Sequence, residues 1–176
     1  MKYICLHHTA VKNTGSPQLW AVNRYHKNKW NMISKYGWYV GYNYFCDTDG
    51  RRTQTRALNE ETIANRGHNC DVPARCDAIS YCMAGDFRVE TPNKKQEDDF
   101  WKFLREMRGL YPDIIVVGHR ELQKDRTCPE LPQDYIDKFN KESPKEDTEK
   151  EEIADLYSQL DFIRSLLIKL MNKLRL

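Results

Sequence analysis

Three residues that lie far apart in the sequence, His7, His119 and Cys128, carry side chains that bind zinc. Short apolar runs, residues 4–6 and 114–117, lead to the two histidines, and Cys128 follows His119 by nine positions. Two imidazoles and one thiolate leave the fourth tetrahedral position of zinc open for water, which is typical of a catalytic zinc site rather than a structural one. The three residues therefore predict a metal-dependent hydrolase.

Two alternatives stay open at this point. His7 is followed by His8, and neighbouring side chains on a strand point to opposite faces, so only one of the two can reach the metal. Cys128 could instead be the nucleophile of a metal-free hydrolase with His119, because a nearby cation such as Arg126 can activate a thiolate. Sensitivity to a chelator would distinguish the two kinds of enzyme.

The bulk properties are those of a chain with one ordinary core. It has 176 residues and a formal net charge of +2, so nothing in its charge demands nucleic acid as a partner. No apolar stretch approaches the roughly 20 residues of a transmembrane segment. No signal peptide is recognisable, because a candidate ligand already lies in the first apolar run. We therefore expect synthesis in the cytoplasm.

The six cysteines do not suggest a disulfide framework, because the chain shows no secretory leader. Cys5, Cys46 and Cys82 lie in apolar, strand-like segments and are expected to be small buried residues. Cys70 and Cys76 flank a proline-containing loop and are the one pair that we consider for a disulfide.

Hydrophobic periodicity predicts the strands and helices that position these candidate residues. Strands are expected at 2–8, 38–46, 51–55, 78–84 and 114–117, helices at 17–30, 96–110 and 132–139, and a loop or short helix at 60–70. Asp49-Gly50 predicts a hairpin turn, and Ser16 is the expected cap of the first helix. Strands that alternate with helices predict an α/β domain, with a mixed central sheet and helices on both faces.

The composition changes near residue 141. We expect a zinc-site domain at 1–140, a polar linker at 141–152 and a helix at 153–176 whose apolar residues recur with heptad spacing. Such a helix is typical of a coiled coil and would make a homo-oligomer. Packing on its own domain and lying on a membrane surface are the alternatives.

Five stretches, in this order, resemble the zinc-dependent N-acetylmuramoyl-L-alanine amidases, the family of phage lysozyme-amidases, anhydro-muropeptide amidases and peptidoglycan recognition proteins. They are LHHTA from Leu6, VGYNYF from Val40 with Asp49-Gly50, GHN from Gly67, AISYCMAGD from Ala78, and VGHRE from Val117 with Cys128-Pro129. The resemblance extends from Met1 to about Asn140.

The resemblance implies that zinc is bound by His7, His119 and Cys128, with His7 rather than His8 as the first ligand. Tyr42 stands where the family keeps a tyrosine beside the reacting water. Recognition proteins that only bind peptidoglycan typically lack the cysteine ligand, so Cys128 favours an active enzyme.

Other positions match the family less closely. Arg126 stands where the family places a lysine or threonine that stabilises the oxyanion, and Lys124 is the nearby alternative. His68 is expected in the substrate groove. His26, among lysines and an arginine, is expected at the surface. Glu121 is not a clear general base and could instead hold a loop.

The resemblance implies cleavage of the amide between N-acetylmuramic acid and L-alanine of the stem peptide, with Zn²⁺ as cofactor and peptidoglycan or muropeptide as substrate. A phage endolysin fits the missing leader. A cytoplasmic muropeptide-recycling amidase, an exported effector and a non-catalytic peptidoglycan-binding module are the alternatives.

Overall fold

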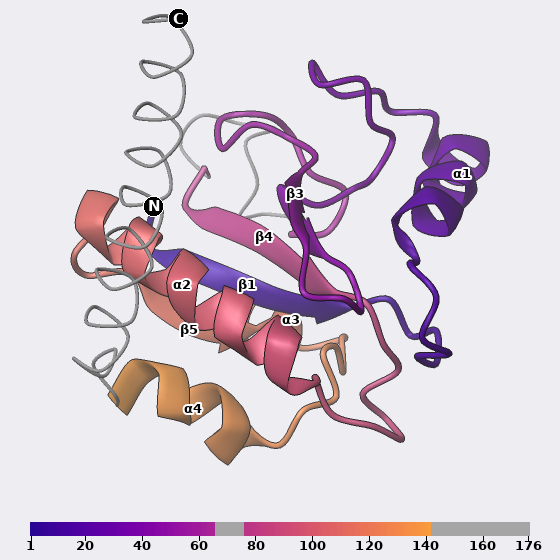
Figure 1. Ribbon diagram of the computed structural model, residues 1–176. Coiled ribbons are helices and arrows are strands. Elements are labelled where there is room, and N and C mark those ends of the chain that lie inside the picture. The colour runs from indigo at the N-terminus through magenta and orange to yellow at the C-terminus, as the bar shows by residue number, and fades with distance from the viewer. Residues whose placement is uncertain (66–75, 142–176) are drawn as a thin grey trace, which may run out of the picture. The chain divides into compact units, whose positions relative to one another are not determined.

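Five strands form one mixed β-sheet in the computed structural model, which describes residues 1–65 and 76–141. The strands are β1 (Tyr3–His8), β2 (Tyr44–Cys46), β3 (Arg52–Gln54), β4 (Ala78–Met83) and β5 (Ile115–Gly118). The helices are α1 (Leu19–Trp30), α2 (Lys94–Leu110), α3 (His119–Leu122) and α4 (Gln133–Lys141). Figure 1 shows their arrangement.

The strand order across the sheet is β3-β2-β4-β1-β5. β1 pairs in parallel with β4 on one side and β5 on the other, β2 is parallel to β4, and only β3 runs antiparallel to its neighbour. The strand that ends in His7-His8 is therefore an inner strand of the sheet. This topology confirms the predicted α/β fold with a mixed central sheet.

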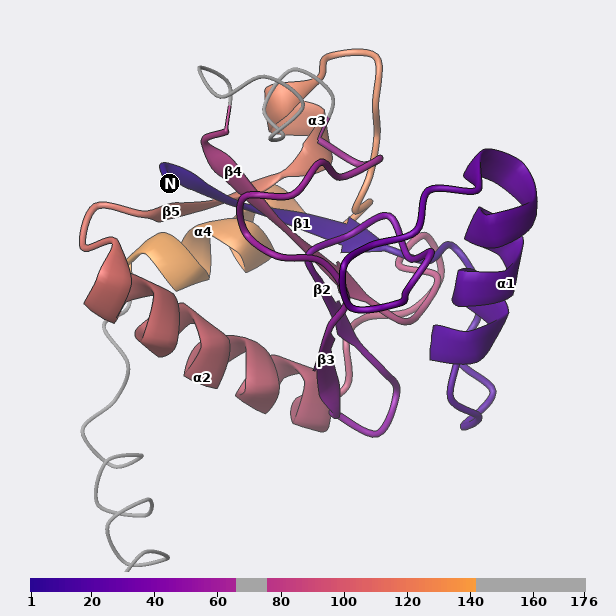
Figure 2. The same ribbon diagram turned by 90° about the horizontal axis from the view of Figure 1, so that it is seen from above.

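The two faces of the sheet are covered by different helices (Figure 2). Ile4 and Leu6 of β1 belong to the larger core cluster, which includes buried aromatic side chains of α2 and α4 such as Phe100 and Phe139. Cys82 of β4 belongs to a smaller cluster with Val40 and Phe45, against which α1 packs through Leu19 and Val22. Successive strand residues face opposite sides, so the central strands must be apolar at almost every position.

The β2–β3 hairpin turns at the predicted Asp49-Gly50 pair. The Gly50 N–H donates to the Asp47 carbonyl at 3.0 Å, and Gly50 has a φ of +83°, a conformation that side chains with a Cβ rarely adopt. The Asp47 carboxylate also accepts hydrogen bonds from the Gln18 and Leu19 N–H groups, at 2.7 and 3.0 Å. Asp47, rather than the predicted Ser16, therefore satisfies the first turn of α1.

The predicted strand at 38–46 is wrong over residues 38–43, because only β2 pairs with other strands. The Asn43 N–H still donates to the Ser80 carbonyl of β4 at 3.0 Å, but two earlier backbone donors of this segment are satisfied by side chains. The Tyr39 N–H donates to Asn23 Oδ1 at 2.7 Å, and the Gly41 N–H donates to His26 Nδ1 at 2.9 Å. Satisfied in this way, the backbone at Tyr39 and Gly41 needs no strand partner and follows an irregular path.

Other predicted elements are confirmed with shifted ends, and α3 is an element that periodicity did not reveal. α2 begins at Lys94 because Asn93 and Gln96 form a capping box. No helix forms over 60–65. His68, Cys70, the expected linker beyond Lys141 and the expected helix at 153–176 lie outside the described residues. Within 1–65 and 76–141, no helix has the length and apolar character needed to cross a membrane.

Candidate metal centre

His7 reaches the candidate site from the end of β1. Its ring is 2% exposed and lies on the same face of the sheet as Cys82, its partner on β4. His7 Nε2 lies 2.7 Å from Asn65 Oδ1, and Nδ1 lies 3.8 Å from Cys128 Sγ. One ring nitrogen therefore faces a neutral amide, and the other faces a thiol.

His119 begins α3 directly after β5, so the chain turns sharply at Gly118. A Cβ at Gly118 would lie 2.9 Å from Pro129 Cδ, and glycine therefore lets this turn pack against the residue that follows Cys128. The Gly118 N–H donates to Glu121 Oε2 at 2.5 Å. Glu121 thus holds this turn, which agrees with the expectation that it holds a loop.

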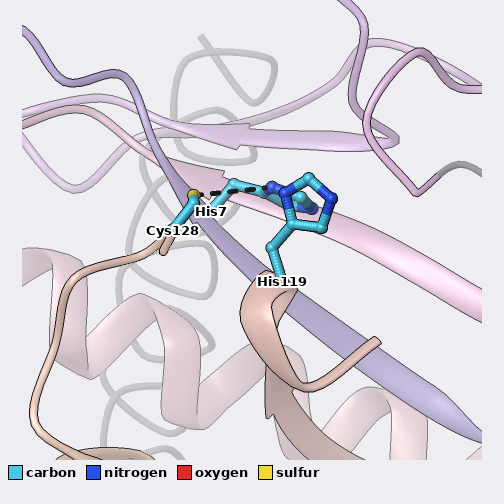
Figure 3. Close-up of side chains that lie close together, drawn as sticks. All are labelled: His7, His119 and Cys128. Atoms are coloured by element: carbon cyan, nitrogen blue, oxygen red, sulfur yellow. Dashed lines mark hydrogen bonds between the residues drawn. The ribbon is translucent and has the colours of Figure 1, made fainter. Parts of the chain in front are cut away.

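Cys128 lies in the loop after α3 and completes the cluster (Figure 3). Its carbonyl accepts a hydrogen bond from the Arg120 N–H at 2.9 Å, which ties the loop back to α3. One donor atom of each of His7, His119 and Cys128 lies within 4.8 Å of the other two. The two imidazole centroids are 4.6 Å apart. Residues separated by more than 120 positions therefore converge at one point.

The donor set and its spacing fit a zinc ion. Zinc bonds of roughly 2.0–2.1 Å to nitrogen and 2.3 Å to sulfur at tetrahedral angles place the two donor atoms about 3.6 Å apart. The observed Cys128 Sγ to His7 Nδ1 distance is 3.8 Å. This pair of donor atoms is therefore already close to the spacing that a zinc ion requires.

Burial shifts the pKa values of all three groups. It lowers the pKa of His7 well below its usual value, with a further contribution from His119, and it lowers the pKa of His119. Both imidazoles are therefore neutral at pH 7 and have a free lone pair. Burial raises the pKa of Cys128 to about 11, so this residue is a thiol until a cation displaces its proton.

His8 is not part of the cluster. Its Nδ1 accepts the Phe87 N–H at 3.0 Å, and its ring packs against the Phe87 ring at a centroid distance of 5.6 Å. The alternation along β1 sends His8 to the opposite face from His7. The fold therefore brings the first histidine of the pair, and not the second, to His119 and Cys128.

Tyr42 lies beside the cluster, with its ring centroid 5.2 Å from that of His7. Burial raises the pKa of its phenol well above the usual value, so the hydroxyl stays protonated at neutral pH and can donate a hydrogen bond. The irregular segment 38–43 is what carries Tyr42 to this position. A regular strand there would have aligned its backbone with the sheet.

Arg126 and Lys124 lie on the turn between α3 and Cys128, and both are exposed. The Arg126 N–H donates to the Gln123 carbonyl at 3.0 Å, and its guanidinium lies 3.6 Å from the Asp125 carboxylate. Its charge lies near enough to His119 to contribute to the lowered pKa of that ring. Arg126 thus lies at the margin of the cluster, and its side chain is accessible to a substrate.

Three residues near the site differ from expectation or were missed. His26 is 6% exposed, and the surface prediction is wrong because its ring packs against Trp30 and its Nδ1 accepts the Gly41 N–H. Asn65 and Gln123, which contact the histidine Nε2 atoms, were missed. Gln123 directly follows α3, four positions after His119, and that spacing became informative only once α3 was known. Asn65 had no such signal.

The chain belongs to the family described as N-acetylmuramoyl-L-alanine amidase, whose model matches residues 1–131. No curated protein matches it. An endolysin of bacteriophage Ph2119 from Thermus scotoductus MAT2119 is a similar solved structure, with 25% identity, a TM-score of 0.59 and coverage of 78% of this chain and 82% of that one.

Two further structures share the fold. The amidase LysC from Clostridium intestinale URNW has 21% identity and a TM-score of 0.56, over 77% of this chain and 82% of that one. The bumblebee recognition protein PGRP-SA has 16% identity and a TM-score of 0.58, over 73% of this chain and 75% of that one. The fold is thus shared by endolysins, amidases and recognition proteins, which supports peptidoglycan amide cleavage or peptidoglycan binding.

Proposed function

We propose that this protein is a zinc-dependent N-acetylmuramoyl-L-alanine amidase, which hydrolyses the amide between the lactyl group of N-acetylmuramic acid and L-alanine of the stem peptide. The observation that carries the proposal is the convergence of His7, His119 and Cys128 in a chain of the amidase family. His7 and His119 would hold zinc through Nδ1, and Cys128 through its sulfur.

Lewis acidity is the chemistry that bound zinc supplies in such a site, because it makes water acidic enough to attack an amide near neutral pH. The protein contributes two neutral imidazoles and a thiol that gives up its proton when the cation enters. His7 lies near the end of β1 and His119 directly follows β5, so the central sheet positions both ligands.

Tyr42 and Arg126 are the proposed catalytic residues. The protonated Tyr42 hydroxyl can donate to the substrate carbonyl or orient the attacking water. The accessible Arg126 guanidinium can stabilise the negative charge that develops on the carbonyl oxygen. Lys124 on the same turn, and His68, are proposed to contact the substrate rather than the reacting bond.

The alternatives have specific observations against them. A metal-free cysteine hydrolase needs a thiolate, whereas burial raises the pKa of Cys128 to about 11. A pure peptidoglycan-binding module is favoured by the likeness to recognition proteins, but the resemblance implies that such modules typically lack the cysteine ligand, which this chain keeps.

We further propose that the protein is a phage endolysin-type lytic enzyme, made in the cytoplasm and acting on the cell wall. The likeness to the Ph2119 endolysin supports this setting. A muropeptide-recycling amidase is the second candidate, and it would prefer soluble fragments over intact wall.

The test is zinc content together with amide cleavage in purified sacculi, with and without chelator. We expect one zinc per chain and chelator-sensitive release of soluble peptides with new L-alanine amino termini. The Cys128→Ser variant should lose both zinc and cleavage. Zinc without turnover on sacculi or on isolated muropeptides would favour the binding module, and cleavage without zinc would refute the metal-dependent mechanism.

A further inference from the structure

We propose that Asn65 and Gln123 are positioning residues that set the tautomer and ring orientation of the two histidines, so that both present Nδ1 to the metal. This inference rests on the proposed function, because it concerns the same zinc site. It adds two residues, each of which lies within hydrogen-bond distance of the Nε2 atom of one imidazole.

The hydrogen bonds determine where each imidazole proton lies. Asn65 Oδ1 is 2.7 Å from His7 Nε2, and Gln123 Oε1 is 2.6 Å from His119 Nε2. An amide oxygen can only accept, so Nε2 of each ring carries the proton and Nδ1 carries the lone pair. His7 Nδ1 is the atom that lies 3.8 Å from Cys128 Sγ.

A free imidazole in water exchanges readily between its tautomers and rotates about its side-chain bonds. A ring in the other tautomer would present an N–H group to the cation and could not bind it without losing that proton. By accepting the Nε2–H proton, the two amides favour the tautomer whose Nδ1 lone pair is free before the metal binds. Ligand histidines in proteins generally donate their second N–H in this way, and loss of the acceptor typically weakens metal binding.

Asn65 is fully buried, and only one end of its amide is satisfied there. Within the described residues its Nδ2 group has no hydrogen-bond partner. A buried amide donor without a partner is costly. Among residues 1–65 and 76–141, the bond to His7 is the one hydrogen bond of the Asn65 side chain. An apolar residue of the same shape would avoid that cost.

The segment that leads to Asn65 is held by hydrogen bonds. Arg56 is 1% exposed and donates to the carbonyls of Val40 and Glu61, at 2.7 and 3.2 Å. The Ile63 N–H donates to the Gly41 carbonyl at 3.0 Å. These bonds attach residues 57–65 to the segment that bears Tyr42. The loop that places Asn65 next to His7 is therefore fixed to the rest of the fold.

Gln123 is held by a hydrogen bond within its own turn, whereas Asn65 lies on a segment held by distant residues. Its own N–H donates to the His119 carbonyl at 2.9 Å, which closes the single turn of α3 and places the side chain next to the ring that begins that turn. Both acceptors are neutral amides rather than carboxylates, so they orient the rings without adding negative charge to the site.

The experiment compares variants that remove the acceptor with variants that keep it. Asn65→Leu and Gln123→Met preserve shape without an acceptor, whereas Asn65→Asp and Gln123→Glu keep an oxygen. Zinc affinity of the full chain is measured by competition with a chromophoric chelator, and folding of each zinc-free variant by thermal unfolding. Nitrogen-15 NMR of the imidazoles reports the tautomers in the zinc-free protein.

We expect Nε2–H tautomers for His7 and His119 in the parent protein. Zinc binding should be about 10–100-fold weaker in Asn65→Leu and in Gln123→Met. The Asp and Glu variants should bind at least as tightly as the parent. If Asn65→Leu does not fold, the comparison of Gln123→Met with Gln123→Glu still tests the inference.

Parent-like zinc affinity in the Leu and Met variants would overturn the inference while leaving the amidase proposal intact, and so would an Nδ1–H tautomer at either histidine. Equal losses in Asn65→Asp and Asn65→Leu would also overturn it, since shape rather than the acceptor would then matter. Failure of the parent protein to bind zinc would overturn the proposed function together with this inference.

Discussion

The two adjacent histidines at the end of β1 differ chiefly in the side of the sheet to which they point. His7 faces Cys128, whereas His8 accepts a backbone N–H from Phe87 and packs against its ring. The same residue type therefore has two separate tasks at consecutive positions. One ring contributes to the candidate metal centre, and the other fastens the chain that follows β4.

This difference predicts opposite outcomes for matched substitutions. Asparagine retains an acceptor near the position of Nδ1 but is a poor zinc ligand, so His7→Asn should lose zinc and amide cleavage. His8→Asn can keep the bond to the Phe87 N–H and should retain both. Zinc content and sacculus cleavage of the two variants are the measurements. Zinc lost only from His8→Asn would contradict the assignment of the ligand.

Tyr42 provides a second test at this scale. If its phenol stabilises developing charge, Tyr42→Phe should lower kcat by about 10²-fold while zinc affinity and KM stay close to those of the parent. The ring remains in Tyr42→Phe, so packing against His7 is preserved. Steady-state kinetics on a soluble muropeptide measure the effect. Unchanged kcat would remove Tyr42 from the catalytic residues.

Helix α1 is attached to the rest of the fold in part through a neutral histidine. His26 Nδ1 accepts the Gly41 N–H, and burial lowers the pKa of this imidazole to about 4. The bond exists only while the ring is unprotonated. The connection between α1 and the segment that carries Tyr42 therefore depends on pH.

The sign of this dependence follows from the two pKa values. Unfolded chains protonate histidine near pH 6.5, whereas His26 in the folded protein resists protonation until about pH 4. Its contribution to stability is therefore complete above pH 6.5 and is lost as the pH falls towards 4. His26→Asn keeps an acceptor for Gly41 without a titrating group.

We expect the free energy of unfolding of the zinc-free parent to fall by about 2 kcal/mol more than that of His26→Asn between pH 7.5 and 4.5. Urea unfolding at the two pH values measures the difference. Parallel pH profiles for the two proteins would show that His26 is not held neutral by the fold.

At the scale of the whole molecule, charge is unevenly distributed along the chain. Residues 1–46 contain six lysine and arginine residues and no aspartate or glutamate, although the chain as a whole has a net charge of only +2. This segment includes β1 with His7 and helix α1, on the side of the sheet where the candidate centre lies. Arg24, Lys27 and Lys29 of α1 are exposed, and such cations favour an anionic polymer as substrate.

We expect binding to purified sacculi to weaken as ionic strength rises, because salt screens exposed charges. The double variant Lys27→Gln/Lys29→Gln on α1 should bind more weakly at low salt. The matched control Lys94→Gln/Lys95→Gln on α2 should bind like the parent. Co-sedimentation with sacculi over a salt series measures both, and equal losses in the two double variants would contradict a role for the α1 side.

Residues 1–141 make one compact unit, which contains every residue of the candidate centre. A chain that ends at Lys141 should therefore keep the zinc affinity of the parent. If the heptad pattern at 153–176 makes oligomers, this truncation should also reduce the number of chains per particle in solution. Sedimentation gives this number, and an unchanged number after truncation would refute the oligomerisation role.

The residue types and their periodicity were sufficient to predict much of this protein. Zinc-ligand chemistry singled out the three residues of the cluster, period-two and period-3.6 patterns located most strands and helices, and Asp49-Gly50 located the hairpin. These signals are local, since each depends on side chains within one element or turn. They could not decide between His7 and His8 from the residues alone.

The tertiary structure decided what depends on contacts between distant segments. It selected His7 by the face of β1, and it made residues 38–43 irregular, with side chains as the acceptors of the Tyr39 and Gly41 N–H groups. It also buried His26 and brought Asn65 to His7 across 58 positions. No local pattern records such pairings, because the partner of a buried polar atom is chosen by the packing of the whole fold.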